Sequence, residues 1–207
     1  MSYDELYFLS RNSKESARAA MRASELERIQ SRTRLENGTV LDIGCGLGEL
    51  LELFPSSNWR RFGIEVSEVA RAECAAKGVE FQLPAGGEWC DLVVLRGSLQ
   101  HLDRPLETLR TAHSWLRAGG WLVVLATPNA GSPVYRMFQE LPALDPPRNF
   151  VVFSDRILRQ CLLNLGFREP TFEFPTLVRH TRVQSGIMHA FFCDCSAFGP
   201  RSRSGAT

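Results

Sequence analysis

The sequence contains neither a long apolar run nor a surplus of one charge sign. No stretch approaches the roughly 20 consecutive apolar residues of a membrane-spanning helix, and the first residues do not resemble a secretory signal. Lys and Arg number 24 against 23 Asp and Glu, which leaves a net charge of +1. A chain with so little net charge lacks bulk attraction to nucleic acid or to a membrane surface. We therefore expect a cytoplasmic protein that neither binds nucleic acid nor spans a membrane.

The cysteines lack the spacing of a zinc site. Of the six, only Cys193 and Cys195 lie close together, and a single residue separates them, which is not the usual spacing of zinc ligands. We expect reduced, mostly buried thiols and no metal site. No internal repeat is visible, and a length of 207 residues favours one domain.

From Gly38 onward, short apolar runs alternate with segments of helical character. The runs are uniformly apolar, as in "DLVVL" and "WLVVLA", which is typical of strands buried on both faces. This alternation predicts a mostly parallel sheet with helices on both faces, a doubly wound α/β fold. Strands are expected at residues 39–43, 60–66, 79–83, 91–95, 121–126, 171–174 and 187–193. Helices are expected in the segment that ends at Leu53 and at residues 68–77, 105–116 and 155–167, the first of these three capped by Ser67 and the last by Ser154.

The first 36 residues are polar and favour a helix. Ser13 is a suitable N-cap, and Lys14, Arg18 and Arg22 recur every four residues, so that they share one helical face. The simpler interpretation is a solvated face, and the alternative is a contact for an anionic substrate. We expect a helical cap at residues 1–36, a main domain at residues 37–198 and a loose tail at residues 199–207.

The segment "TVLDIGCGLGELLELF", residues 39–54, carries three glycines at alternate positions after an acid. A dinucleotide-binding loop has the pattern G-x-G-x-x-G, which Gly44 and Gly46 fit. The third glycine is Gly48, one position too early, and Glu49 stands where that pattern requires glycine. An acid there is unfavourable for a pyrophosphate, and no Lys-Ser/Thr pair follows, which excludes a P-loop.

A glycine turn beside an acid suits a ligand with an ammonium group and a modest anionic group. Backbone amides can meet a carboxylate, while Asp42 can act on the ammonium directly or through water. Glu65 ends the second expected strand, 21 residues after Gly44, where a carboxylate can accept hydrogen bonds from ribose hydroxyls. NAD sites share this second feature, so Glu65 indicates a ribose rather than one cofactor. The methionine portion of S-adenosylmethionine (SAM) has both required groups.

Several segments resemble those of class I SAM-dependent methyltransferases that act on small molecules. They are "VLDIGCGLG", "FGIEVS", "CDLVVLRGSLQHLDRP" and "LRAGGWLVVLATPN", and the resemblance covers residues 39 to about 167. The later stretches "TPNAGSPVYRMF" and "DPPRNFVVFSDRILRQCLLNLGF" are similar to a subgroup linked to glycan, lipid or secondary-metabolite modification. The resemblance implies a Rossmann-like sheet of seven strands in the order 3-2-1-4-5-7-6, with the last strand antiparallel.

The resemblance also implies which residues hold SAM. Glu65 would hold the ribose diol and Val66 would flank the adenine, while residues 96–98 would pass the methionine end. The family commonly has an acid after the third strand that faces the adenine amino group. This chain has none there, so Gln82 or a backbone carbonyl would have to serve. The expected cofactor-binding residues are Asp42, Gly44, Cys45, Gly46, Gly48, Glu65, Val66, Gln82, Arg96 and Gly97.

Methyl transfer depends on alignment and on exclusion of water, and a hydroxyl acceptor also benefits from a base. His101 follows the fourth expected strand, at the edge of the sheet where ligands bind in open α/β folds. It is the candidate base; the alternative is a histidine that braces its loop. Three further residues are candidates for substrate contacts: Tyr135 in a lid, Arg148 as an anion contact and Asn149, which stands where the subgroup commonly has histidine.

These features predict a SAM-dependent methyltransferase with a small-molecule or glycan/lipid-type acceptor, modified at oxygen. One alternative is a methyltransferase-like module that binds SAM or a nucleoside without turnover, because the adenine-side acid is missing and Asn149 replaces a histidine. A more distant alternative is an NAD-dependent oxidoreductase.

Overall fold

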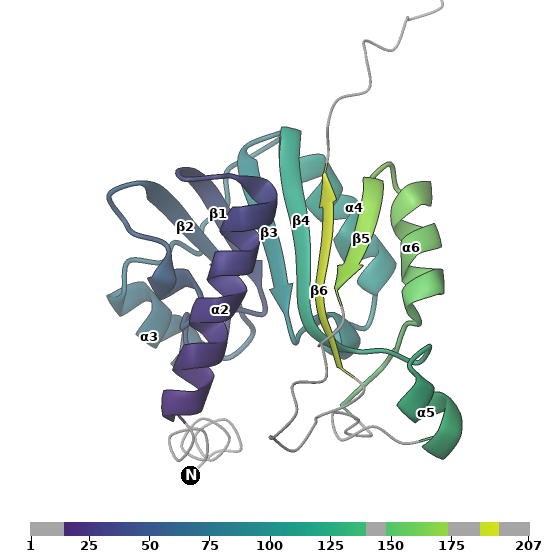
Figure 1. Ribbon diagram of the computed structural model, residues 1–207. Helices are drawn as coiled ribbons and strands as arrows, with labels where there is room; N and C mark the ends of the chain where they lie inside the picture. Colours follow the sequence, from purple (N-terminus) through teal and green to yellow (C-terminus); the bar gives the residue numbers. More distant parts are fainter. Residues whose placement is uncertain (1–14, 140–147, 174–186, 195–207) are drawn as a thin grey trace, which may run out of the picture.

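A computed structural model describes residues 15–139, 148–173 and 187–194 of the chain. These residues form a six-stranded sheet in the order β2-β1-β3-β4-β6-β5, covered by helices (Figure 1). The first four strands of that order pair in parallel, and β6 is antiparallel to both β4 and β5. The strands are β1 (Gly38–Ile43), β2 (Trp59–Ile64), β3 (Cys90–Arg96), β4 (Leu116–Pro128), β5 (Arg168–Glu173) and β6 (Ile187–Asp194).

The segment predicted as the third of seven strands does not form one. Residues 79–83 contribute a single parallel bridge, between Glu80 and Phe62 of β2. Gly78, with a φ of 78°, turns the chain just before the bridge, and Pro84 follows it without an amide hydrogen for a ladder. The described sheet therefore has six strands, and the bridge lies at the edge beside β2, where the predicted order places the third strand.

Helices form where the sequence predicts them in all but one case. Ser67 and Ser154 cap their helices through backbone amides three residues ahead. The prediction of a helix that ends at Leu53 is wrong, because the segment forms turns and a 3-10 helix, η2 (Leu51–Leu53). Only residues 49–54 lie between Gly48 and Pro55, which is fewer than two helical turns. The other helices are α2 (Glu15–Thr33), α3 (Glu68–Ala76), η3 (Leu99–His101), α4 (Pro105–Trp115), α5 (Pro133–Phe138) and α6 (Asp155–Asn164).

The sheet buries apolar side chains on both faces because alternate residues of each strand point in opposite directions. Leu41 and Val93 belong to the cluster that α4 and α6 cover, with Leu109 and Leu158 among its members. The other cluster contains Val40, Val94 and Val123, and Ile29 of α2 is packed into it. Figure 1 shows α2 lying across this second face. Residues 1–14 and 199–207, which belong to the expected cap and tail, lie outside the described residues.

None of the described helices combines the length and the apolarity that crossing a bilayer requires.

The burial of Ile29 predicts that α2 is part of the core rather than a detachable addition. Ile29 is 1% exposed, so Ile29→Ala is expected to lower the free energy of unfolding by about 2–5 kcal/mol. Met21→Ala, at a position on the same helix that is 41% exposed, should change it by about 0.5 kcal/mol or less. Urea denaturation of both variants measures the difference. Equal, small effects would show that α2 contributes little to the folded state.

Candidate functional site

The loop after β1 is held tightly against the end of β3. Gly44 has a φ of 81°, and a Cβ there would lie 2.6 Å from the Cβ of Ser98. Both the left-handed backbone and the lack of space therefore require glycine. The Ser98 hydroxyl donates to the Ile43 carbonyl at 2.5 Å, which joins the two strand ends directly. The predicted glycine loop thus forms at the carboxyl edge of the sheet, where open α/β folds bind ligands.

Glu65 lies beside this loop, as the sequence predicts. Its Oε2 accepts a hydrogen bond from the Gly46 amide at 2.9 Å. Its Oε1 accepts from the amides of Val66 and Ser67 at 2.8 and 3.0 Å. The Val66 side chain is 94% exposed, so an apolar group projects into solvent next to the carboxylate. Gln82 is exposed in the segment after the bridge, and its role in ligand binding stays a prediction.

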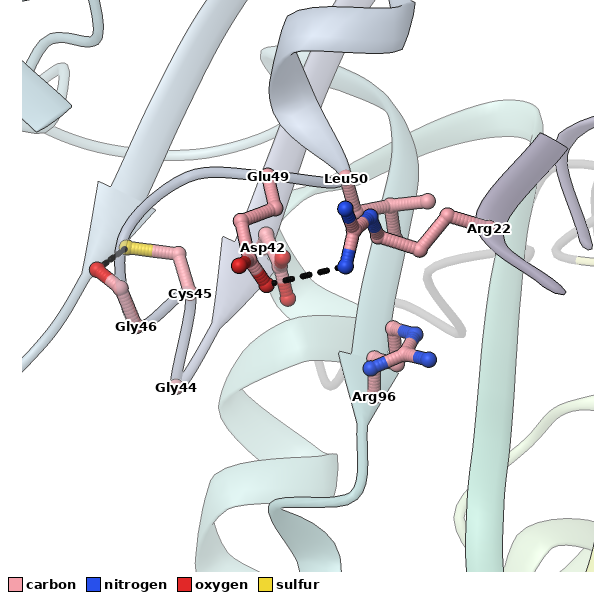
Figure 2. Close-up of a pocket in the computed structure, with 8 residues that line it drawn as sticks. All are labelled: Arg22, Asp42, Gly44, Cys45, Gly46, Glu49, Leu50 and Arg96. Atoms are coloured by element: carbon pink, nitrogen blue, oxygen red, sulfur yellow. Dashed lines mark hydrogen bonds and ion pairs between the residues drawn. The ribbon is translucent and has the colours of Figure 1, made fainter. Parts of the chain in front are cut away.

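A small pocket of about 50 Å³ opens at the glycine loop (Figure 2). It brings together five of the predicted cofactor-binding residues, and its lining also contains three residues that sequence reasoning did not assign to the site. The lining consists of Asp42, Gly44, Cys45, Gly46 and Arg96, together with Arg22, Glu49 and Leu50.

Arg22 corrects the simpler interpretation of the basic face on the first helix. Its side chain is 7% exposed rather than solvated, and it reaches from α2 to the pocket (Figure 2). The sequence did contain a signal for this burial. Arg22 precedes Ile29 by seven residues and Leu26 by four, so it shares the helix face that carries these apolar side chains.

Asp42 is the buried acid of the site. It is 2% exposed, and its Oδ1 accepts no hydrogen bond from any residue within the described ranges. Burial raises the pKa of Asp42 from 3.8 to about 7; Arg96 lowers it, and the nearby Glu65 and Glu25 raise it further. Near neutral pH the carboxyl is therefore partly protonated, and a cationic group placed beside it would favour its ionised form.

Two buried ion pairs connect α2 to the rest of the site. Arg22 Nη1 lies 3.3 Å from Glu49 Oε2, which joins α2 to the loop after β1. Arg96 Nε lies 2.7 Å from Glu25 Oε2, which joins α2 to the end of β3. All four side chains are at most 16% exposed. Because desolvating charges is costly, buried pairs are weak evidence for stability and call for another explanation.

His101 lies on η3 and braces the segment that contains the predicted substrate residues. Its Nδ1 is 2.9 Å from the carbonyl oxygen of Arg148, and its Nε2 is 3.3 Å from Nε2 of Gln100. A carbonyl only accepts, so Nδ1 donates in the neutral ring and Nε2 accepts from the Gln100 amide. The structure brings the backbone of Arg148 to His101, and Asn149 follows in the chain, whereas Tyr135 lies on α5, a separate element. The role of His101 as a base stays a prediction.

Buried polar side chains that sequence reasoning missed hold the same edge together. The Thr127 hydroxyl donates to Gln100 Oε1 at 3.1 Å, and Gln100 Nε2 donates to the carbonyl of Gly97 at 2.9 Å. Asn129 Oδ1 accepts from the amides of Gly131 and Asp155 at 2.7 and 3.1 Å. These contacts position the ends of β3 and β4 and the start of α6. Only their location after apolar runs indicated a role in the site.

The buried carboxyl of Asp42 predicts a pH-dependent stability. It titrates near 3.8 in the unfolded chain and near 7 in the folded protein, so the folded state holds its proton more tightly in this interval. The free energy of unfolding should therefore fall as pH rises from about 4 to 7. Asp42→Asn removes this dependence and should be a few kcal/mol more stable than the wild type at pH 8.

Urea denaturation at pH 4.5 and pH 8 measures this gain, which should be much smaller at the lower pH. The exposed Asp103→Asn controls for the loss of one carboxylate. An Asp42→Asn gain of the same size at both pH values would show that ionisation of this group is not its cause.

Comparison with known proteins gives the site its context. Residues 13–169, well over half of the chain, match the family described as a methyltransferase domain. A tRNA U34 carboxymethyltransferase of Desulfotalea psychrophila is 31% identical over 103 residues, which are 50% of this chain and 32% of that protein. A ubiquinone biosynthesis O-methyltransferase of Ruegeria pomeroyi is 32% identical over 110 residues, 47% of this chain and 44% of that protein. The chain thus spans less than half the length of either relative.

The fold agrees with this match. A crystal structure of a SAM-dependent methyltransferase from Thermotoga maritima superposes with a TM-score of 0.66 at 20% identity, covering 93% of this chain and 97% of that one. Its likeness concerns the fold, whereas the family match concerns the sequence itself. With Asp42, the glycine loop and Glu65 at the carboxyl edge of the sheet, the match shows that this chain belongs to the class I SAM-dependent methyltransferase family.

Proposed function

We propose that this chain transfers the methyl group of SAM to a small-molecule or glycan/lipid-type acceptor, at an oxygen atom. The observation that carries the proposal is the convergence of Asp42, the glycine loop and Glu65 at one edge of the sheet, with Glu65 2.9 Å from the Gly46 amide. An ammonium-binding acid and a ribose-binding acid, joined by a loop of backbone amides, suit the two halves of SAM.

The buried acid supports the fit to SAM independently of the family. Asp42 Oδ1, which no described residue supplies with a hydrogen bond, suits the ammonium group of the methionine portion. Glu65 would hold the ribose hydroxyls in exchange for part of its backbone contacts. The exposed side chain of Val66 would cover one face of the adenine. Gln82, or a backbone carbonyl near it, would meet the adenine amino group.

SAM would supply a methyl group on a sulfonium: the acceptor oxygen would bond to the methyl carbon as the carbon–sulfur bond breaks, with S-adenosylhomocysteine as the leaving group. The chain's own task is to align the acceptor and to exclude water. We propose His101 as the group that takes the acceptor proton, at Nε2, which carries the ring's lone pair because Nδ1 donates to the Arg148 carbonyl. The acceptor hydroxyl would take the place of the Gln100 amide, which lies 3.3 Å from Nε2. Tyr135, Arg148 and Asn149 are proposed to contact the acceptor from α5 and from the segment that His101 braces.

The net charge and the names of the relatives together support the proposed acceptor class. One relative's name assigns it to ubiquinone biosynthesis as an O-methyltransferase, and the other's assigns it to tRNA. The net charge of +1 gives this chain no general attraction to a polyanion, which favours a small molecule over tRNA. Loss of turnover is the alternative, because the chain lacks the acid expected on the adenine side after residues 79–83 and has Asn149 where the subgroup commonly has histidine.

Two measurements test the proposal. Calorimetry with SAM and with S-adenosylhomocysteine should show binding, and incubation with SAM and a host metabolite extract should yield a methylated product detectable by mass spectrometry. No binding at millimolar ligand would refute the methyltransferase function. Binding without any product would favour the module that lacks turnover.

Removal of the Glu65 carboxylate is expected to weaken the binding of S-adenosylhomocysteine. Loss of the ribose hydrogen bonds should cost about 1–3 kcal/mol, roughly a 5- to 150-fold rise in the dissociation constant of Glu65→Ala. Glu65→Gln keeps the size of the side chain and separates this effect from disruption of the loop. Glu73→Ala, at an exposed position of α3, is the control. Unchanged affinity in a folded Glu65→Ala variant would show that the cofactor lies elsewhere.

Replacement of His101 separates catalysis from bracing. If its Nε2 takes the acceptor proton, His101→Gln should lower kcat by about 10²–10⁴-fold with the acceptor identified in the extract. The affinity for S-adenosylhomocysteine should change little, because the histidine contacts the segment at Arg148 rather than the pocket. Full activity of His101→Gln would exclude the histidine as the base. A fall in kcat that is accompanied by a clear fall in the melting temperature would assign it a bracing role alone.

A further inference from the structure

Two thiols face each other beneath the glycine loop. Cys45 belongs to the loop and Cys74 to α3, and their Sγ atoms lie 4.0 Å apart. Both side chains are buried, at 7% and 0% exposure, and both are free cysteines. Two neighbouring thiols can form a disulfide when an oxidant converts one of them to a sulfenic acid, which the other then attacks.

Two glycines leave the space that the two sulfurs occupy. A Cβ at Gly48 would lie 2.8 Å from the Sγ of Cys74, and a Cβ at Gly63 would lie 2.7 Å from the Sγ of Cys45. Gly63, on β2, does not have a left-handed backbone, so space rather than backbone conformation explains the glycine there. The sulfur pair thus fills a gap enclosed by the loop, β2 and α3.

The surroundings make Cys74 the more acidic of the two thiols. A hydrogen bond from Cys45 lowers the pKa of the Cys74 thiol; burial raises it and nearby Lys77 lowers it, with a net decrease. The same hydrogen bond, together with burial, raises the pKa of the Cys45 thiol. Because the thiolate is the nucleophile, Cys74 is the sulfur that reacts with an oxidant, and Cys45 is its resolving partner.

An oxidant can reach the pair through the pocket. Cys45 is part of the pocket lining (Figure 2), and the sulfur of Cys74 lies 4.0 Å from the Cys45 sulfur. The volume of about 50 Å³ admits a few water-sized groups, which allows hydrogen peroxide to enter and keeps out a bulky oxidant such as glutathione disulfide. Since Cys74 itself is buried, its oxidation should be slower than that of an exposed thiol.

We propose that hydrogen peroxide joins Cys45 and Cys74 in a disulfide that displaces the glycine loop and weakens cofactor binding. The Cys74 thiolate attacks one peroxide oxygen: the S–O bond forms, the O–O bond breaks, and the departing hydroxide takes the proton that Cys74 gave up. The Cys45 sulfur then attacks the sulfur of this sulfenic acid: the S–S bond forms, the S–O bond breaks, and hydroxide leaves with the Cys45 proton. Two thiols lose two electrons in all, and one peroxide becomes two water molecules.

The disulfide would move a loop that has little freedom. The two sulfurs must approach from 4.0 Å to about 2.0 Å. Cys45 stands between Gly44, which has no room for a side chain, and Gly46, whose amide holds Glu65 at 2.9 Å. Cys74 also donates its thiol hydrogen to the Gly46 carbonyl at 3.1 Å, and the disulfide removes this hydrogen. The effect on the cofactor rests on the proposed function, whereas the disulfide can form whatever the loop binds.

Peptide mapping tests the chemistry on the folded protein. The protein is treated with hydrogen peroxide, free thiols are blocked, and the digest is analysed by mass spectrometry without reduction. The peptide of Cys45 linked to the peptide of Cys74 should appear, and dithiothreitol should remove it. Absence of this linkage would overturn the inference and leave the proposed function untouched.

Calorimetry with S-adenosylhomocysteine tests the consequence for binding. Peroxide should weaken binding about 10-fold or more in the wild type and less than about 2-fold in Cys74→Ser, which cannot form the bond. Dithiothreitol should restore the affinity of the oxidised wild type. Cys161→Ser removes a less buried thiol, on α6, and is the matched control, which should respond to peroxide as the wild type does.

The outcomes separate this inference from the proposed function. Linkage without a change in affinity would overturn the effect on the loop. An equal loss of affinity in Cys74→Ser would assign the loss to other oxidised side chains and overturn the inference. Absence of binding to the reduced wild type would overturn the proposed function and, with it, the effect on the cofactor. If Cys74→Ser does not fold, Cys74→Ala takes its place, and reversal by dithiothreitol in the wild type decides the matter without a variant.

Discussion

The close approach of the glycine loop to the end of β3 determines the geometry of the whole site. Gly44 lies so near Ser98 that no side chain fits between them, and the Ser98 hydroxyl holds the carbonyl of Ile43. This contact places Asp42 and Arg96 on facing strand ends and positions the Gly46 amide to reach Glu65. The positions of Asp42, Arg96 and Glu65 relative to one another therefore depend on backbone packing that a side chain at Gly44 would prevent.

The site is a place where stability is given up for binding. Burial raises the pKa of Asp42 to about 7, so its ionised carboxylate destabilises the folded protein. Two ion pairs are also desolvated where α2 meets the sheet. Apolar side chains of similar size would often serve the fold as well or better. Farther along the same face of α2 the contact with the sheet is apolar: Ile29 lies in the core with Val40 and Val123. The helix α2 is therefore held to the sheet by apolar packing near its end, while a preceding turn brings Arg22 into the pocket.

The sequence predicted the parts of the site that local backbone conformation encodes. The register of Gly48, the acid at Asp42 and the position of Glu65 define a loop that the structure shows, because each depends on neighbours within one strand-turn unit. For Arg22 the sequence left both a solvated face and an anion contact open. Its pairing with Glu49 was not predicted, because Glu49 is distant in sequence and the contact arises from packing of α2 on the sheet. The two wrong predictions, a helix ending at Leu53 and a strand at residues 79–83, have local causes that the pattern of apolar residues does not include. Pro55 limits the length of the first segment, and Pro84 directly follows the second.

The position of β6 within the sheet governs the order in which the chain can complete it. Among the described strands, β5 pairs with β6 alone, and β6 joins it to β4. Residues 168–173 leave the ribosome before residues 187–194, yet they have no edge to pair with until the later segment arrives. The four parallel strands lie before residue 129, whereas pairing of β5 with β6 requires residues up to Asp194. Until residues 187–194 are in place, the edge of β4 that they cover has no strand beside it.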